Sequence, residues 1–296
     1  MSFKLNNFIS DLGLFYAAAI WGSTFFIVKD SLNSIDPVVM VSYRFLLSAF
    51  LMAIPLLFLR KKLFSNFKPG LILGILLWFI YVPQTVGLAY TTASNSGFIT
   101  GIFVAFVPVF SFMFFRKFPT PTRTLAVIIS VIGLWLLTGG LTDFNFGDMI
   151  TVITAMAYAA HILAADVYAK NNIDPYIISF QQFFVTGILS LLSGLILGLP
   201  FSITSTKAIW VIAFLAIFPG LLAFVIQMRA QKSTSPIKVS LIFALEPVFA
   251  AIFAWTFGNE PIIAHRAIGG LFIFIAMIIS ELSLDKYLVF WKKPKK

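Results

Sequence analysis

The chain has 296 residues, of which 60% are hydrophobic and only 11% are charged. Its mean hydropathy of +0.99 excludes a soluble globular protein, because a core this apolar cannot be covered by the polar residues available. The sequence contains no cysteine, which excludes disulfides and thiolate metal sites. We therefore expect the lipid bilayer to be the solvent of this chain.

Apolar stretches of about 17 to 22 residues are long enough to cross a hydrocarbon core of about 30 Å as helices. The first does not resemble a cleaved signal peptide, because nine more follow it and no clear cleavage site comes after it. No phosphate-binding loop of the G-x-x-x-x-G-K-[ST] type is present. In chain order, the ten predicted transmembrane helices are Leu12–Val28, Val38–Phe58, Gly70–Tyr90, Gly97–Phe115, Thr124–Leu141, Met149–Val167, Tyr176–Leu197, Ile209–Met228, Val239–Phe257 and Ala267–Leu284.

Two short motifs recur at nearly the same separation. Ile35-Asp36-Pro37 returns 138 positions later as Ile173-Asp174-Pro175. Val107-Pro108-Val109-Phe110 is matched 139 positions later by Glu246-Pro247-Val248-Phe249. The matches predict a duplication into residues 1–141 and 142–285, followed by a basic tail at 286–296. Five helices in each copy would invert the second copy, and inverted repeats are typical of alternating-access transporters with a site near the bilayer midplane.

Lys and Arg are distributed unevenly between the predicted connections. With the N-terminus in the cytoplasm, 17 of them lie on the inner side, three lie on the outer side, and Arg44 alone lies within a helix. This asymmetry predicts that both termini are cytoplasmic. The net charge of +10 then reflects membrane topology and attraction to anionic headgroups, and we expect no nucleic-acid partner.

Several motifs, in order along the chain, resemble those of the drug/metabolite transporter superfamily, EamA type. They are Trp21-Gly22-Ser23-Thr24-Phe25, Tyr43-Arg44-Phe45, Ala89-Tyr90-Thr91-Thr92-Ala93, Leu245-Glu246-Pro247-Val248 and Gly258-Asn259-Glu260. One departure is that Phe118-Pro119-Thr120-Pro121, the first-half counterpart of the last motif, lacks the acid. The resemblance implies an exporter or exchanger of small metabolites in the bacterial inner membrane, and it does not specify the substrate.

Aromatic residues near the middle of the helices are candidates for substrate binding. Trp21 and Tyr158 each lie about nine residues into a helix, which is roughly 14 Å of depth. Tyr81 and His161 fall near the same level, and helical spacing places Trp78, Tyr81 and either Gln84 or Thr85 on one face. The candidate substrate-binding residues are Trp21, Trp78, Tyr81, Gln84, Tyr158 and His161. The alternative for each aromatic residue is helix packing or lipid contact, and for His161 a structural hydrogen bond in place of a proton relay.

Charged residues inside the bilayer are costly and therefore informative. Glu246 is either a proton-coupling carboxylate or a protonated, hydrogen-bonded group that caps backbone freed by Pro247. Arg44 either attracts a substrate carboxylate or holds helices together. Their depths differ by about 10 Å, so a direct ion pair is not the default expectation.

Prolines within the predicted helices indicate hinges or gates, because each removes a backbone hydrogen bond and permits a kink. Pro83 and Pro219-Gly220 interrupt the third and eighth helices, and Pro108 and Pro247 interrupt the fourth and ninth at matched positions. Ordinary kinking is the alternative for any single proline. Gly97-x-x-x-Gly101 predicts a close helix contact, either within the chain or between two copies.

The sequence thus predicts an all-α membrane protein of ten transmembrane helices in two inverted five-helix repeats. Its expected function is secondary transport of small organic metabolites, among them amino acids or related zwitterions, by alternating access around a central cavity. The expected partners are a small-molecule substrate, the lipid bilayer and protons, and the chain acts as a monomer or homodimer. We expect no cofactor, no metal and no enzymatic activity; a channel or facilitator is the first alternative and a membrane-embedded enzyme a more distant one.

Overall fold

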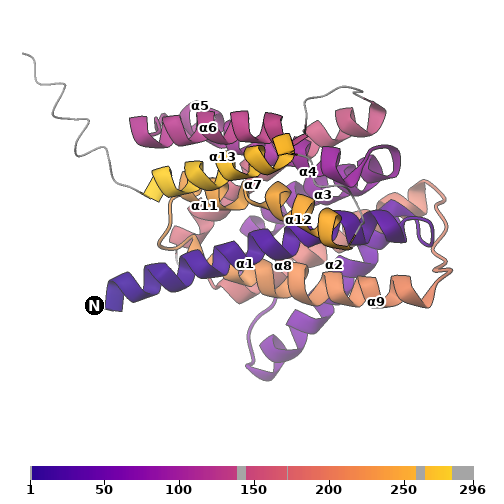
Figure 1. Cartoon of the computed structure of the whole chain (residues 1–296). Helices are drawn as coiled ribbons and strands as arrows, with labels where there is room; N and C mark the ends of the chain where they lie inside the picture. Colours follow the sequence, from indigo (N-terminus) through magenta and orange to yellow (C-terminus); the bar gives the residue numbers. More distant parts are fainter. Residues whose placement is uncertain (1, 139–144, 172, 258–263, 282–296) are drawn as a thin grey trace, which may run out of the picture.

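The structure is a computed structural model that describes residues 2–138, 145–171, 173–257 and 264–281. Every regular element in these residues is a helix (Figure 1). The predicted division near residue 141, the Gly258-Asn259-Glu260 motif and the basic tail lie outside the described residues. The helices are α1 (Ser2–Ser31), α2 (Pro37–Phe58), α3 (Phe67–Tyr90), α4 (Ala93–Gly101), α5 (Phe103–Phe115), α6 (Pro121–Thr138), α7 (Phe146–Lys170), α8 (Pro175–Ile196), α9 (Thr206–Leu215), η1 (Ala216–Leu222), α10 (Ala223–Ala230), α11 (Pro236–Phe243), α12 (Glu246–Phe257) and α13 (Ala264–Glu281).

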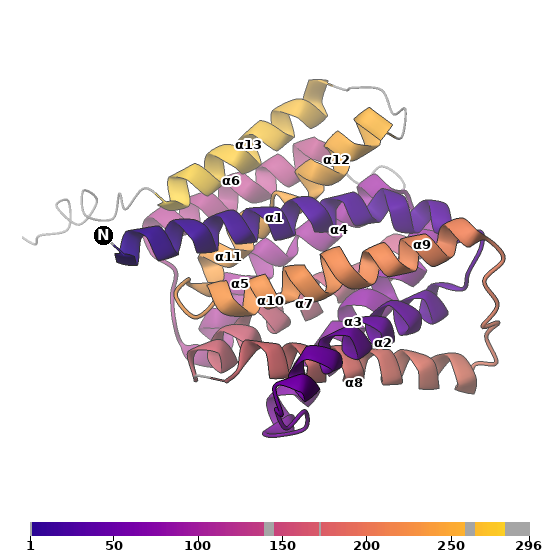
Figure 2. The ribbon, with the colours of Figure 1, turned by 90° about the horizontal axis from the view of Figure 1, so that it is seen from below.

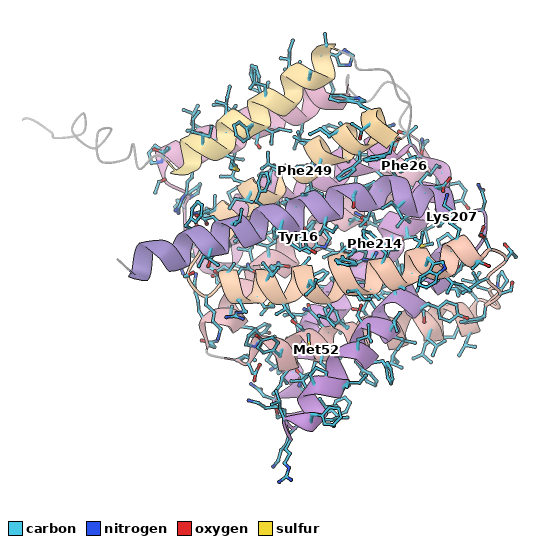
Figure 3. All side chains as sticks on the ribbon, turned by 60° about the horizontal axis from the view of Figure 1, so that its bottom comes forward. Tyr16, Phe26, Met52, Lys207, Phe214 and Phe249 are labelled. Atoms are coloured by element: carbon cyan, nitrogen blue, oxygen red, sulfur yellow. The ribbon has the colours of Figure 1, made fainter. Side chains whose placement is uncertain are left out.

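The described helices confirm the prediction of ten membrane spans. Eight helical stretches are long and apolar enough to cross a bilayer, and Pro121–Leu136 and Ala267–Ile279 are two shorter apolar helices. The fourth, eighth and ninth spans each consist of consecutive pieces: α4–α5, α9–η1–α10 and α11–α12. Figures 1 and 2 show the start of α1 and the end of α13 at the same end of the bundle, which we call the terminal end. The opposite end, where Lys207 lies in Figure 3, is the far end.

The repeated Ile-Asp-Pro motif begins an equivalent helix in each copy. Asp36 caps α2 by accepting hydrogen bonds from the backbone of Val38 at 2.8 Å and Val39 at 3.2 Å. Asp174 caps α8 in the same way, through the backbone N–H of Tyr176 at 2.9 Å. In both helices the proline occupies the first turn, where no backbone donor is needed.

The contacts between the two copies follow a twofold pattern. α2 packs on its counterpart α8, and α6 packs on its counterpart α13. α3 of the first copy packs against α7 of the second, and in the reciprocal contact α10 of the second copy packs against α1 of the first. Exchanging the copies therefore maps the α2–α8 and α6–α13 contacts onto themselves and exchanges the other two, as expected for inverted repeats.

The fourth and ninth spans correspond in the structure at a different sequence separation from that of their shared motif. α5 and α12 begin 143 positions apart, as do α6 and α13, whereas the Val-Pro-Val-Phe match has a separation of 139. Pro108 therefore lies inside α5, while Pro247 lies in the first turn of α12. The prediction that these two prolines hold matched positions is wrong by about one helical turn.

The breaks in these two spans do correspond in the structural register. The fourth span is interrupted at Ile102, and the ninth at Ala244 and Leu245. Pro247 has no N–H to donate to the carbonyl four residues earlier, so α11 ends at Phe243 and Leu245 instead bonds to the Ile242 carbonyl at 3.1 Å. The chain therefore starts a new helix in the middle of the ninth span.

Close approach of backbones fixes the packing of α1 on α12. A Cβ on Gly22 would lie 2.5 Å from the carbonyl oxygen of Glu246 and 2.6 Å from Cβ of Phe249. Gly97 and Gly101 are likewise packed within the chain, the former beside Ala250 and the latter beside Leu134 and Pro247. The predicted glycine contact is thus made inside the bundle.

Candidate functional site

A small cavity lies between the two copies, in the interior of the bundle. Its volume is ≈ 10 Å³, which is space for about one water molecule. Helices α1 and α3 of the first copy and α7, α10 and α12 of the second supply its walls. The lining residues are Trp21, Thr24, Ile80, Tyr81, Gln84, Tyr158, Phe224 and Glu246.

Trp21 is the residue most firmly fixed at this cavity. Its indole Nε1 donates a hydrogen bond of 2.7 Å to the carbonyl oxygen of Pro219, across the boundary between the copies. Its ring also packs on Phe224 and Phe243, with centroid distances of 5.0 and 4.9 Å, and on Tyr158 at 6.1 Å. The buried indole therefore has both an apolar environment and a partner for its polar atom.

The acceptor of this bond lies in a widened helical turn. Residues Ala216–Leu222 form a π-helix, where Pro219 cannot donate a backbone hydrogen bond. Ser48 of α2 donates to the Ala216 carbonyl at 2.9 Å, so two side chains of the first copy hold carbonyls of this segment. A Cβ on Gly220 would come within 2.7 Å of Ser48 Oγ. The predicted hinge Pro219-Gly220 thus lies in an irregular segment that contacts the cavity wall, and such turns are frequent at functional sites.

The counterpart span, α3, is a continuous α-helix through Pro83. It is held by reciprocal bonds from the second copy: Thr154 donates to the Ile80 carbonyl and Thr186 to the Gly74 carbonyl, both at 3.0 Å. Thr186 is 138 positions after Ser48, so one donor occupies equivalent positions in both copies. Each copy therefore donates side-chain hydrogen bonds to carbonyls of one span of the other copy, but the two spans that accept them, α3 and the eighth span, differ in conformation.

Among the described residues that line the cavity, Glu246 supplies the only carboxylate. It is buried and is the first residue of α12, where the positive end of the helix dipole favours an acidic group. The hydroxyl of Tyr158 donates to Glu246 Oε2 at 3.4 Å, a long bond. The break before Pro247 is what places a helix start, and hence this acid, at mid-span.

Arg44 lies behind the cavity wall. Its guanidinium carbon is 4.5 Å from the ring centroid of Tyr81 and 5.0 Å from that of Phe45, within cation–π range. Nε and Nη2 of this buried side chain have no hydrogen-bond partner among the described residues. Within the same residues no ion pair joins it to Glu246. Tyr81, which lines the cavity, separates the cation from it.

Five of the predicted site residues line one cavity: Trp21, Tyr81, Gln84, Tyr158 and Glu246. Gln84 also donates to Thr100 Oγ1 at 3.2 Å. Two candidates lie elsewhere. His161 is 2.9 Å from Gln182 through Nε2, between α7 and α8, and Trp78 is half-buried with its ring against Phe79.

Three lining residues were not predicted as site residues from the sequence: Thr24, Ile80 and Phe224. Thr24 follows Trp21 by three residues, so helical spacing was a usable signal for it. Ile80 is adjacent to Tyr81 and has no polar atom that would distinguish it. Phe224 follows the π-helix, which alters the facing of every residue after it, so its position could not be obtained from α-helical spacing.

The model of the EamA-like transporter family matches the chain twice, at residues 8–139 and 145–282. An uncharacterized transporter of Archaeoglobus fulgidus is 32% identical over 273 residues, which covers 92% of this chain and 86% of that protein. The uncharacterized inner membrane transporter YedA of Escherichia coli is 26% identical over 298 residues and covers 95% and 92%. A crystal structure with 18% sequence identity superposes with a TM-score of 0.79 over 94% of this chain and 98% of that chain, which shows a shared fold.

Proposed function

Since the chain belongs to the EamA-like transporter family, we propose that it is a secondary transporter that carries a small organic metabolite by alternating access. The observation that carries the proposal is the cavity between the two inverted copies, with a buried carboxylate on one wall and aromatic rings on the others. At ≈ 10 Å³ the cavity is too small for a metabolite, so substrate binding requires the copies to move apart on one side.

The substrate class that fits this site is an amino acid or a related zwitterion. Glu246 would bind the ammonium group, beside the rings of Trp21 and Tyr158, which favour cations on their faces. Arg44 would bind the carboxylate after Tyr81 turns aside, since two nitrogens of its guanidinium have no hydrogen-bond partner in the described part of the chain. A buried charge without a partner is costly, so Glu246 would carry a proton whenever it does not hold the substrate, which makes the transporter a proton exchanger.

The difference between α3 and its counterpart supports a mechanism of alternation. In the present state the eighth span contains the π-helix and α3 does not. In the opposite-facing state α3 would bend at Pro83, which lacks the N–H for a backbone hydrogen bond. The breaks before α5 and α12 would let the adjoining half-helices follow. We place both termini in the cytoplasm and the protein in the bacterial inner membrane, as the charge asymmetry favours.

Counterflow in proteoliposomes tests the proposal. Vesicles loaded with one unlabelled amino acid or amine at a time are assayed for uptake of the same labelled compound. We expect saturable exchange for at least one zwitterion, acceleration by a proton gradient, and loss of both in Glu246→Gln. Asp30→Asn is the matched control, because Asp30 is an exposed carboxylate paired with Lys207 at the far end. Flux that is unchanged in Glu246→Gln, or equally reduced in Asp30→Asn, would contradict the assigned role.

A further inference from the structure

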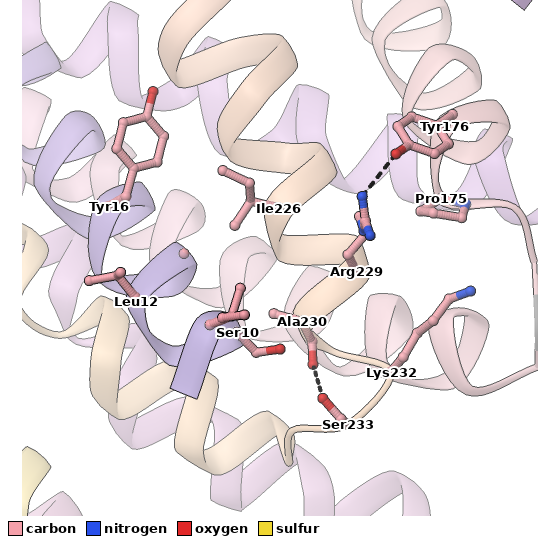
Figure 4. A pocket seen from close by; sticks show the side chains of 12 residues that line it. Ser10, Leu12, Tyr16, Pro175, Tyr176, Ile226, Arg229, Ala230, Lys232 and Ser233 are labelled. Carbon is pink, nitrogen blue, oxygen red and sulfur yellow. Dashed lines mark hydrogen bonds between the residues drawn. The ribbon is translucent and has the colours of Figure 1, made fainter. Parts of the chain in front are cut away.

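A second and much larger cavity opens at the terminal end of the bundle, between α1, α8 and α10 (Figure 4). Its volume is ≈ 920 Å³. Its walls are apolar, with Ile9 and Leu12 from α1, Ile226 from α10 and Pro175 from α8. Arg229 and Lys232 supply two cations at its rim. We call this cavity the terminal groove.

The terminal groove faces away from the central cavity. At 100° per residue, Ile9, Leu12 and Tyr16 lie on the side of α1 opposite Trp21. Ile9 and Leu12 are each 58% exposed, while Leu14, Ala17 and Ala18 on the inner face are fully buried. On α10 the groove residue Ile226 is likewise about 200° around the helix from the buried Phe224. The groove therefore opens on the outer surface of a membrane helix, where lipid is the neighbour.

The rim of the terminal groove is basic. Arg229 Nη1 donates to the hydroxyl of Tyr176 at 3.0 Å, which holds the guanidinium at the groove (Figure 4). Lys232 lies in the turn that follows the end of α10 at Ala230. The acids nearest in sequence are engaged elsewhere: Asp11 pairs with Lys238 at 2.9 Å, and Asp174 pairs with Lys61 at 3.2 Å. No carboxylate is among the described residues that line the groove.

The cations and the apolar walls of the terminal groove lie at different depths, in the same order as the headgroup and acyl chains of a membrane lipid. Ile226 precedes Arg229 by one helical turn, so the apolar wall lies about 4.5 Å deeper in the bilayer than the guanidinium. Arg229 is next to last in α10, at the level where a span meets the headgroup region. Basic pockets between transmembrane helices at this level suit anionic headgroups.

We propose that the terminal groove binds an anionic phospholipid, with its phosphate between Arg229 and Lys232 and the start of an acyl chain against Ile226 and Leu12. A soluble anion would use the cations but would leave the lipid-facing apolar walls uncovered. The site is independent of the transported substrate, because no residue is shared between the two cavities.

Lipid binding to the purified full-length protein in detergent tests this inference. Binding of phosphatidylglycerol and of phosphatidylcholine with the same acyl chains is titrated by native mass spectrometry. We expect a preference for phosphatidylglycerol that falls about fivefold for each cation removed in Arg229→Gln and Lys232→Gln. The control Lys62→Gln/Lys117→Gln removes two exposed charges from other connections of the terminal end and should keep the preference.

Two further measurements keep the test decisive if neutral substitutions disturb folding. The variant Arg229→Lys/Lys232→Arg keeps both charges and should keep the preference, and elution volume reports whether each variant is folded. The inference is overturned if the wild-type protein binds both lipids alike, or if the control pair loses the preference as the groove pair does. It is also overturned if inorganic phosphate competes for the site as well as phosphatidylglycerol, since the groove would then be a soluble anion site.

Discussion

Replacing Trp21 by Phe isolates the hydrogen bond that joins the first copy to the π-helix. The substitution removes the Nε1 donor, and the carbonyl oxygen of Pro219 loses a partner at 2.7 Å. The six-membered ring remains to pack against Phe224 and Phe243. The variant therefore separates the polar contact from most of the apolar one.

The expected cost follows from the burial of both partners. Interhelical side-chain hydrogen bonds in membrane proteins contribute about 0.6 kcal/mol on average and about 1.7 kcal/mol at most. A buried carbonyl left without a partner costs about 1–3 kcal/mol. Trp21 and Pro219 are both buried, so we expect a loss of about 1–2 kcal/mol, or roughly 2–4 °C in Tm.

The assay is the fraction of protein that remains monodisperse after heating in detergent, measured together with counterflow. Trp210→Phe is the control, because this tryptophan is 72% exposed near the start of α9. Phe224→Leu removes comparable ring area from the same cluster but no hydrogen bond. The assignment would be refuted if Trp21→Phe and Trp210→Phe had equal Tm values. It would also be refuted if Trp21→Phe kept full transport and an unchanged Tm while Phe224→Leu lowered the Tm.

Three further outcomes are expected. Gly22→Val should abolish correct assembly, because its Cβ would lie 2.5 Å from a backbone carbonyl of the ninth span, whereas Gly97→Ala, whose Cβ finds its nearest atom at 3.6 Å, should fold; fluorescence-detected size exclusion distinguishes them. Tyr158→Phe should change the free energy of unfolding by less than about 0.5 kcal/mol, because the lost bond is long, but should raise the KM of counterflow, because its hydroxyl donates to the Glu246 carboxylate. The native rings of Tyr90 and Phe146 are 5.5 Å apart at the far end, so a short bismaleimide should cross-link and inactivate the double variant Tyr90→Cys/Phe146→Cys. Because the native chain has no cysteine, a single-cysteine variant that cannot be cross-linked within the chain is the control. Continued flux after complete cross-linking would exclude movement of α3 against α7.

The sequence was sufficient where local chemistry determines structure. Length and hydropathy predicted the ten spans. The helices predicted to begin at Val38 and Tyr176 do begin next to the two Ile-Asp-Pro motifs, because Asp and Pro act within one turn of their own position. Depth along a helix also brought Trp21 and Tyr158 to one level, since the rise per residue is constant. These inferences need no knowledge of the neighbouring helices.

The rest depends on how helices turn and pack, which the sequence pattern does not contain. His161 satisfied the depth criterion but pairs with Gln182, because rotation about the helix axis places it toward α8. The four-residue difference in register between Pro108 and Pro247 arises from extra residues in the second copy, one in the eighth span and three in the connection after it, and short motif matches do not detect it. Arg44 and Glu246 were both recognised as unusual, but only the structure shows Tyr81 between the cation and the cavity.

The widened turn lies in the longer of the two corresponding spans. The third span uses 24 residues and the eighth uses 25. A π-turn bonds each residue to the fifth along the chain, so it accommodates an inserted amino acid with little added length. Removing a single codon between positions 216 and 222 should therefore yield a regular helix like α3, and the indole that now binds the Pro219 carbonyl would lose its acceptor. An irregularity at the centre of this protein would then have begun as one inserted triplet of nucleotides.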